Sequence, residues 1–175
     1  VCILGAESTG TTTLSRSLAK EFETIWVPEY GRFYSEAIVH SNHQWIDEDF
    51  VHIAKTQAEI EDRMAGLSSG LLICDTNAFA TRLWQERYMG KITDEVNEIG
   101  RRSVVNLYII TDVDIPFVSD GTRDGEHIRE KMHQRFVNEV AKTKVPYIIV
   151  SGSSSARLAK AIKRINELVR EKVTI

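Results

Sequence analysis

The sequence predicts an α/β fold of three layers, in which a five-stranded parallel sheet carries helices on both faces. Three observations predict it. Short apolar runs alternate with amphipathic helical stretches along the 175 residues, the first run leads through a glycine-bracketed loop into a helix, and polar residues follow the ends of several runs. Strands that alternate with helices form parallel sheets, and such sheets bind ligands at the carboxyl ends of their strands. We therefore expect a site built from strand ends.

The composition fits one domain over residues 1–175. With 42% apolar and 27% charged residues, the chain can bury a sizeable core. The formal net charge of −3 argues against a general nucleic-acid binder, and no apolar run approaches the roughly 20 residues of a membrane helix. Cys2 and Cys74 lie in apolar runs, so we expect reduced, buried thiols in a cytoplasmic protein. Because the sequence begins inside its first strand, we expect a piece of a longer protein or a missing disordered start.

A phosphate-binding loop is predicted after the first strand, residues 1–4. The pattern is G-x-x-x-x-G-K-[ST], with Thr11 at the lysine position. Glycines let the backbone turn sharply and aim several N–H groups at one anion, and a helix N-terminus adds partial positive charge. The alternative is a plain strand-to-helix turn whose threonines cap the helix. We expect the Thr12 hydroxyl to reach Mg²⁺ and the nucleotide phosphates to contact Gly5, Ala6, Glu7, Ser8, Thr9, Gly10, Thr11, Thr12 and Thr13.

The remaining elements follow from apolar runs and helical periodicity. Continuous apolar runs predict strands covered on both faces, and apolar residues at helical spacing predict amphipathic helices. We expect strands at 25–28, 71–74, 104–110 and 146–150, and helices at 33–39, 47–64, 78–88 and 93–102. After a loop-rich segment, one helix reaches about residue 142, and a last helix turns inward Leu158, Ile162, Ile165 and Val169.

Asp75 closes the predicted apolar strand 71–74. An acid at this place in a phosphoryl-transfer enzyme holds Mg²⁺ or accepts a proton from the attacking hydroxyl. The alternative is a cap for the following helix, where Asp and Asn are favoured. Asn77 is equally suited to binding a substrate hydroxyl and to capping that helix.

A carboxylate, an aromatic ring and a guanidinium follow the strand 25–28, in Glu29, Tyr30 and Arg32. A kinase needs a carboxylate that orients the acceptor hydroxyl and takes its proton, and a cation near the transferring phosphoryl group. A surface ion pair between Glu29 and Arg32 is the alternative. Gln57 lies on the apolar side of its helix, where it either contacts substrate or is a satisfied core glutamine.

The segment of about residues 113–130 is charged and hinged by glycines, as expected of a lid that closes over ATP and excludes water. Asp120, Arg123 and Arg129 are its candidate functional residues. A solvated charged loop is the alternative, for Arg129 more than for Arg123.

Several motifs run in a fixed order through essentially the whole chain: a loop that begins Gly-Ala-Glu-Ser, then Glu29-Tyr30-Gly31-Arg32, Gln57, Asp75-Thr76-Asn77, Asp120-Gly121-Thr122-Arg123 and Lys144-Val145-Pro146-Tyr147-Ile148. In this order and spacing, they resemble the ribosylnicotinamide kinase domain of the bacterial NadR family. That resemblance implies a P-loop NTPase fold and transfer of the γ-phosphoryl group of ATP, with Mg²⁺, to the 5′-hydroxyl of nicotinamide riboside in NAD salvage.

Roles for single residues follow from the resemblance. Glu29 or Asp75 would be the base, with Glu29 preferred, and Arg32 and Arg123 would hold phosphates. Arg129 would contact ATP, and the acceptor would meet Tyr30, Arg32, Gln57, Asn77 and Asp120. An aromatic ring would stack on the cationic pyridine, the candidates being Tyr30, Trp26, Trp45 and Phe50.

Two residues depart from the family pattern, which more often has Lys at Thr11 and Asp at Asn77. A charge-assisted hydrogen bond is worth about 1.5–3 kcal/mol, so losing the lysine lowers the rate or the affinity. Thr11 still offers its N–H to phosphate, and nucleotide binding is therefore expected to survive better than turnover. Two alternatives therefore stay open: a kinase of the same fold with another small acceptor, and a nucleotide-binding regulatory module that has lost efficient transfer.

Overall fold

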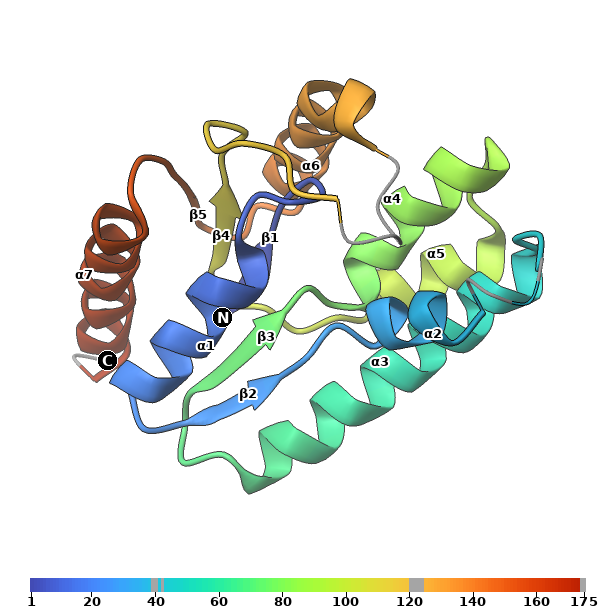
Figure 1. Ribbon diagram of the computed structural model, residues 1–175. Helices are drawn as coiled ribbons and strands as arrows, with labels where there is room; N and C mark the ends of the chain where they lie inside the picture. Colours follow the sequence, from blue (N-terminus) through green and yellow to red (C-terminus); the bar gives the residue numbers. More distant parts are fainter. Residues whose placement is uncertain (39–40, 42, 120–124, 174–175) are drawn as a thin grey trace.

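A parallel sheet in the order β2-β3-β1-β4-β5 forms the middle of the molecule (Figure 1). The computed structural model describes residues 1–38, 41, 43–119 and 125–173, without the side chains of 171–173. The strands are β1 (Cys2–Leu4), β2 (Ile25–Val27), β3 (Leu72–Asp75), β4 (Tyr108–Thr111) and β5 (Tyr147–Val150). All of their pairings are parallel, which confirms the predicted sheet.

Helices cover both faces of this sheet, because successive residues of each strand point to opposite sides. Cys2 and Leu4 of β1 face one core and Ile3 faces the other. The first core packs against α3 (Asp47–Leu67), α4 (Ala78–Met89) and α6 (Arg129–Lys142), and the second against α1 (Thr11–Glu21) and α7 (Ser154–Val173). The other helical elements are α2 (Tyr30–Ile38), α5 (Asp94–Arg101) and the short 3₁₀ turn η1 (Glu126–Ile128).

The register of the central strands sets the place of the site. Ile3 of β1 pairs with Asp75 of β3, and Leu4 pairs with Ile110 of β4. The loop after β1 and the acid that ends β3 therefore leave the same edge of the sheet side by side. β1 lies between β3 on one side and β4 on the other, so the strand order reverses beside β1. In open α/β sheets, ligands bind at such a point, outside the carboxyl ends of the strands.

Two elements start three or more residues away from the position that the sequence predicts. The predicted strand 104–110 is wrong at its start, because β4 begins at Tyr108, where its pairing with β1 begins, and Val104 is 92% exposed. The predicted helix 33–39 begins earlier, at Tyr30, so Glu29 directly precedes α2. Residues 120–124 of the predicted lid lie outside the described part of the chain.

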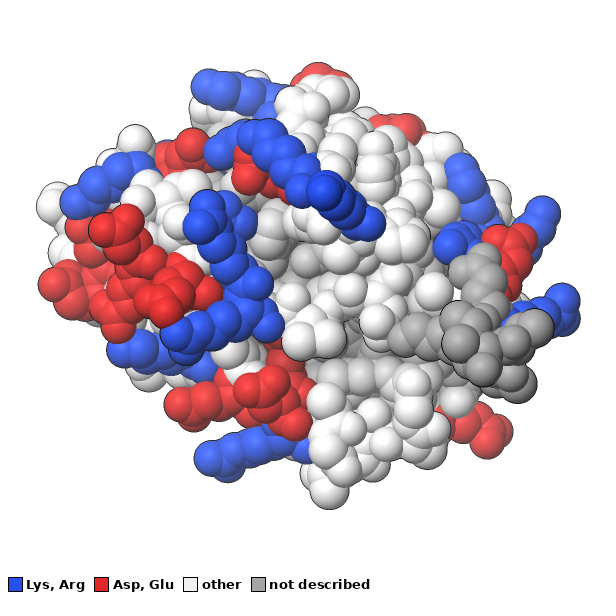
Figure 2. All heavy atoms as spheres, turned by 180° about the vertical axis from the view of Figure 1, so that it is seen from behind, with Lys and Arg blue, Asp and Glu red and all other residues white. Residues whose placement is uncertain are grey.

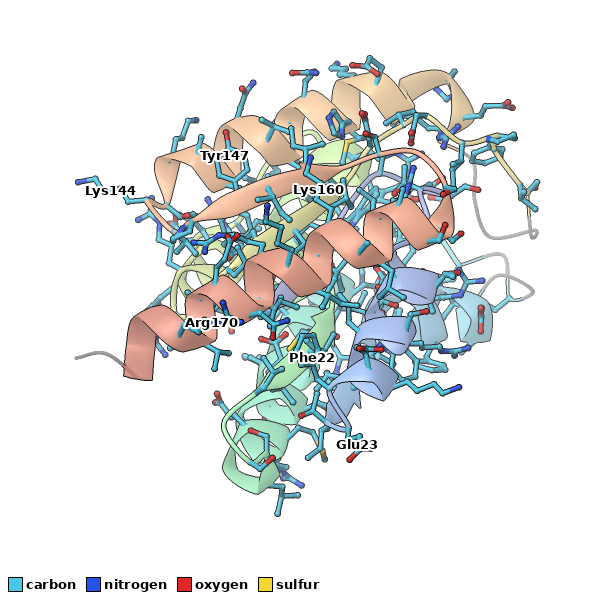
Figure 3. All side chains as sticks on the ribbon, turned by 90° about the vertical axis from the view of Figure 1, so that its left-hand side faces the viewer. Phe22, Glu23, Lys144, Tyr147, Lys160 and Arg170 are labelled. Carbon is cyan, nitrogen blue, oxygen red and sulfur yellow. The ribbon has the colours of Figure 1, made fainter. Side chains whose placement is uncertain are left out.

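Surface and core agree with the remaining expectations about composition. Cys2 and Cys74 are buried free thiols on neighbouring strands, as predicted. On the face shown in Figure 2, acidic and basic side chains are interspersed around a largely uncharged centre. Figure 3 shows α6 and α7 flanking the edge strand β5, with Tyr147 on that strand. Among the described helices, none combines the length and apolar character that crossing a membrane requires.

Candidate active site

The loop from Gly5 to Gly10 is held in a conformation that leaves the first amides of α1 open. Ser8 and Gly10 adopt left-handed backbone angles, with φ of 57° and 85°. A Cβ atom at Gly5 would overlap the hydroxyl oxygens of Thr111 and Thr9, so this position requires glycine. Thr9 Oγ1 lies 2.7 Å from both the Ala6 carbonyl oxygen and Thr111 Oγ1, which ties the loop to the end of β4.

Gly10 is the N-cap of α1, and a glycine has no side chain with which to cap a helix. The alternative reading, in which a threonine is the N-cap, is therefore wrong. The N-terminal amides of α1 are left for water or a ligand, and an anion is the ligand that a helix N-terminus favours. This geometry agrees with the predicted phosphate-binding loop.

Asp75 is buried beside that loop. Its side chain is 2% exposed, and its Oδ1 has no hydrogen-bond partner among the described residues. Burial raises the pKa of Asp75, against the opposing effects of the Thr12 and Thr11 hydroxyls and the positive charges of Arg16 and Arg32. A buried oxygen without a partner is costly, so a ligand that supplied one would be favoured.

Asp75 does not cap α4, because the N-cap of that helix is Asn77. The Asn77 Oδ1 accepts a hydrogen bond of 3.3 Å from the Ala80 N–H. The structure thus excludes Asp75 as the cap of α4 and gives that role to Asn77. The role of Asp75 at Mg²⁺ or as a base stays a prediction. The Asn77 Nδ2 is buried without a partner in the described structure, and its contact with a substrate stays a prediction.

A large cavity opens from the loop toward α2, α3 and α4. Its empty volume, including space continuous with solvent, is about 1020 Å³. Four helices bring polar and aromatic side chains to it, and half of the predicted site residues line it. The lining consists of Ile3, Gly5, Ala6, Glu7, Ser8, Thr11, Thr12, Glu29, Gly31, Arg32, Ser35, Trp45, Phe50, Ile53, Gln57, Thr76, Thr81, Trp84 and Tyr88. We call it the acceptor cavity.

One wall of the acceptor cavity is aromatic. The ring of Trp45 lies 5.1 Å from that of Phe50 and 5.4 Å from that of Tyr88, centroid to centroid. Trp45 and Phe50 were among the predicted stacking candidates, whereas Trp84 and Tyr88 were not. Their spacing of four residues places them on one face of α4, which is the signal that could have found them. Trp26 is elsewhere, with Arg16 over its ring at 4.5 Å.

The predicted polar residues of the acceptor side meet at the start of α2. Glu29 and Arg32 both line the acceptor cavity, and Arg32 Nε donates to Glu36 Oε1 at 2.9 Å. Gln57 is 1% exposed; its Oε1 accepts from the Tyr30 N–H at 2.8 Å, and its Nε2 has no partner among the described residues. A contact of Gln57 with the substrate stays a prediction. The hydroxyl of Tyr30 pairs with His52 Nε2 at 2.8 Å.

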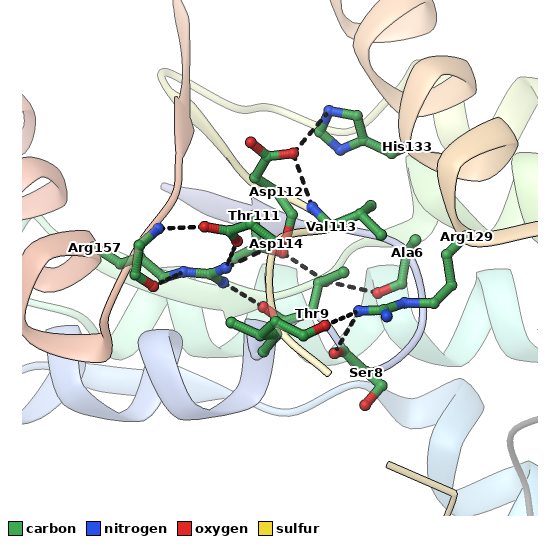
Figure 4. A network of polar contacts seen from close by, with 12 residues as sticks. Ala6, Ser8, Thr9, Thr111, Asp112, Val113, Asp114, Arg129, His133 and Arg157 are labelled. Carbon is green, nitrogen blue, oxygen red and sulfur yellow. Dashed lines mark hydrogen bonds and ion pairs between the residues drawn. The ribbon is translucent and has the colours of Figure 1, made fainter. Parts of the chain in front are cut away.

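Other predicted nucleotide contacts are tied to protein groups. The Glu7 carboxylate accepts from Arg87 Nη1 at 3.2 Å and from the Gly125 N–H at 2.8 Å, so it joins the loop to α4 and to the segment before η1. The Arg129 guanidinium donates to backbone carbonyls of the loop (Figure 4). Contacts of Glu7 and Arg129 with ATP stay predictions. Asp120 and Arg123 lie outside the described residues.

A second, smaller cavity of about 440 Å³ lies on the other side of the start of α1. We call it the outer cavity. It was not predicted, because its residues come from the loop, from the segment after β4 and from the start of α7, which are far apart in sequence. They are Gly10, Thr13, Leu14, Ser17, Ile115, Gly152, Ser154, Arg157 and Leu158.

Comparison with known proteins places this site in a family. The family model described as AAA domain matches residues 1–157. The chain belongs to this AAA domain family. Over 175 residues it is 26% identical to the trifunctional NAD biosynthesis/regulator protein NadR of Salmonella typhimurium, and 25% identical to the protein of that name from Escherichia coli. Each alignment covers 98% of this chain and 43% of the relative, so the chain spans less than half of these relatives.

Solved structures show the same fold. A structure of NadR protein in complex with NR matches with a TM-score of 0.80 at 21% identity, covering 95% of this chain and 50% of that chain. A structure of NadR protein with NAD and AMP-PNP matches with a TM-score of 0.76 at 20% identity, covering 95% and 48%. The three-layer P-loop fold and the relationship to NadR proteins, which the order of motifs predicted, are thereby confirmed.

Proposed function

We propose that this AAA-family domain is an ATP- and Mg²⁺-dependent kinase that phosphorylates the 5′-hydroxyl of nicotinamide riboside, giving nicotinamide mononucleotide. The observation that carries the proposal is a single juxtaposition: open helix amides, a buried acid with a free oxygen, and a cavity with Glu29 and aromatic rings all adjoin one loop. Relatives named for NAD biosynthesis, and neighbours solved with NR and with AMP-PNP, support this choice of substrates.

The residues beside the loop fit a magnesium ion. Mg²⁺ takes oxygen ligands and uses one or two carboxylates together with phosphate oxygens and water. Asp75 offers a buried oxygen without a partner, and Thr12 adjoins it. The described residues contain no group of three or more His, Cys, Asp or Glu side chains that could hold a metal alone. Asp75 and Thr12 would hold the ion only with the nucleotide, and the ion would neutralise charge on the phosphates.

The acceptor hydroxyl would be activated by Glu29, which lines the acceptor cavity. Glu29 takes the proton of the 5′-hydroxyl while the oxygen of that hydroxyl bonds to the γ-phosphorus. The bond from the γ-phosphorus to the β–γ bridging oxygen breaks at the same time and releases ADP. Arg32 and the amides at the start of α1 stabilise the charge that spreads over the equatorial oxygens. The aromatic wall of Trp45, Phe50, Trp84 and Tyr88 suits a cationic pyridine ring.

An ADP-release assay tests this function. The chain is supplied with ATP, Mg²⁺ and a panel of nucleosides, and the phosphorylated product is identified by mass. We expect turnover with nicotinamide riboside well above that with adenosine, uridine or cytidine. Turnover with another nucleoside only would identify a kinase of different acceptor specificity, and tight ATP binding without turnover would identify a regulatory module, the reading that Thr11 favours.

The variant Glu29→Gln tests the proposed base. Because general-base catalysis contributes about 10²–10⁴-fold, we expect a loss of that size in kcat, with ATP affinity by calorimetry nearly unchanged. Glu59→Gln, which removes an exposed acid on α3, is the matched control and should keep wild-type turnover. Wild-type kcat in Glu29→Gln would exclude Glu29 as the base.

A further inference from the structure

Two buried arginines hold the backbone of the phosphate-binding loop from behind. Arg129, the first residue of α6, donates from Nε to the Glu7 carbonyl at 3.1 Å and from Nη2 to the Ser8 carbonyl at 3.1 Å. Arg157, in the first turn of α7, donates from Nη1 to the Thr9 carbonyl at 2.5 Å. Successive carbonyls of the loop therefore each accept a charged hydrogen bond, from helices far apart in the sequence (Figure 4).

Both guanidinium groups are fixed by further contacts. Arg129 also donates to the Ile115 carbonyl at 3.0 Å, and Arg157 to the Gly152 and Asp112 carbonyls at 3.0 and 3.3 Å and to the Asp114 carboxylate. The two residues are 8% and 4% exposed. Desolvation raises the pKa of Asp114, but the hydrogen bond from the Gly152 N–H and the charge of Arg157 outweigh this effect and bring the pKa below its usual value. The arginines thus join the loop to the segment after β4.

The direction of these bonds orients the loop amides. In a trans peptide the C=O and N–H groups point in opposite directions. When the carbonyls of Glu7, Ser8 and Thr9 point toward the arginines, the N–H groups of Ser8, Thr9 and Gly10 point away from them. Hydrogen bonds to a charged donor also polarise a peptide, so its N–H becomes a stronger donor.

Fold stability alone does not explain this arrangement. A cation in the first turn of a helix is unfavourable, yet Arg157 lies there, and burying charged pairs is often no better than burying apolar residues. The arginines also maintain the left-handed Ser8, whose φ is 57°, a conformation that costs about 1–2 kcal/mol outside glycine. Thr11 supplies no cation to the phosphates, whereas the guanidinium groups of Arg129 and Arg157 place positive charge against the loop backbone.

We propose that Arg157 and Arg129 are positioning residues that set the phosphate-binding loop before nucleotide arrives and strengthen its amides in place of the missing lysine. The proposal rests on the loop binding the phosphates of ATP, as the proposed function requires. It assigns both arginines to the loop backbone. Arg157 also lines the outer cavity, whereas Arg129 lines neither of the two cavities, so variants of Arg129 separate an effect on the loop from an effect on the nucleoside.

Comparison of ATP with adenosine tests this assignment. We expect Arg129→Gln to weaken ATP binding about tenfold, the equivalent of one charge-assisted hydrogen bond, while adenosine binding, followed by NMR, is unchanged. Arg129→Lys keeps the charge but loses the paired hydrogen bonds to the loop, and it should recover part of the ATP affinity. Lys131→Gln removes an exposed positive charge from the same helix and should match wild type.

Each contrary result has a distinct meaning. An equal loss of ATP and adenosine affinity would overturn the proposal, because it would show contact with the nucleoside or general damage to the fold. Unchanged ATP affinity in a folded Arg129→Gln protein would overturn it as well. If that variant does not fold, Arg129→Lys carries the same comparison. None of these measurements uses an acceptor, so failure to phosphorylate nicotinamide riboside would refute the proposed function and leave this inference standing.

Discussion

Thr11 is the residue at which this site departs most from other phosphate-binding loops. It lines the acceptor cavity and adjoins Asp75, so a longer cationic side chain at this position would reach the transferring phosphoryl group directly. The arginines behind the loop act through its backbone, to whose carbonyl groups they donate.

Thr11→Lys is therefore expected to raise kcat about tenfold, the value of one added charge-assisted hydrogen bond in the transition state. Thr11→Met is the matched control, because it adds comparable length without charge, and it should not raise kcat. The measurement is steady-state ADP release with saturating acceptor. Equal rates in the two variants would show that an arginine already provides the charge.

Single residues of the site were predictable where local rules decide them. Gly5 and Asp75 follow from the loop pattern and from the end of an apolar strand, and Gln57 from its place on an apolar helix face. Arg129 and Arg157 were not predictable in these roles, because their contacts with the loop backbone join segments that are distant in sequence. The orientation of a guanidinium depends on the whole packed fold, and no spacing rule encodes it.

At the scale of elements, α3 and α4 meet through a buried carboxyl group. Glu61 of α3 accepts a hydrogen bond of 3.2 Å from the N–H of Ala78, the first residue of α4. Burial raises the pKa of Glu61 to about 7 from the usual 4.5, in spite of the hydrogen bonds that lower it. Between these two values the native state binds more protons than the unfolded state, so stability falls as the pH rises.

Glu61→Gln should remove most of this pH dependence. The stabilising effect of the proton is complete below pH 4.5 and is lost as the pH rises through about 7, so wild type should lose about 1–3 kcal/mol relative to Glu61→Gln between pH 5 and 8. Urea unfolding at several pH values gives the slopes. Glu59→Gln, at an exposed position on the same helix, is the control. Parallel pH profiles for wild type and Glu61→Gln would contradict the prediction.

Element types were more predictable than element ends. The helices with clear periodicity lie where the sequence places them, whereas β4 starts later than its apolar run. Val104 continues that run, but a strand exists only where a neighbour supplies hydrogen bonds, and β1 pairs from Cys2 onward. The start of α2 at Tyr30 likewise depends on the Gln57 oxygen that accepts the Tyr30 N–H, which is a tertiary contact.

At the scale of the whole molecule, the two cavities share one loop. The acceptor cavity takes Gly5 to Ser8 with Thr11 and Thr12, and the outer cavity takes Gly10 and Thr13. A nucleotide whose phosphates lie on the loop can therefore occupy one side while the acceptor occupies the other. This arrangement favours direct transfer between two ligands that are bound together.

A covalent intermediate with the phosphoryl group on a cysteine is disfavoured, because both thiols are buried. Burial raises the pKa of Cys74 to about 12 and that of Cys2 well above its usual value, so neither thiol is available as a thiolate nucleophile.

We expect sequential kinetics, in which double-reciprocal plots at several acceptor concentrations intersect, instead of the parallel lines of a ping-pong mechanism. Label should not exchange between ADP and ATP when the acceptor is absent, because no enzyme group holds the phosphoryl group between the two substrates. Exchange in the wild type would instead show that an enzyme group accepts the phosphoryl group, and the direct-transfer mechanism would then be wrong.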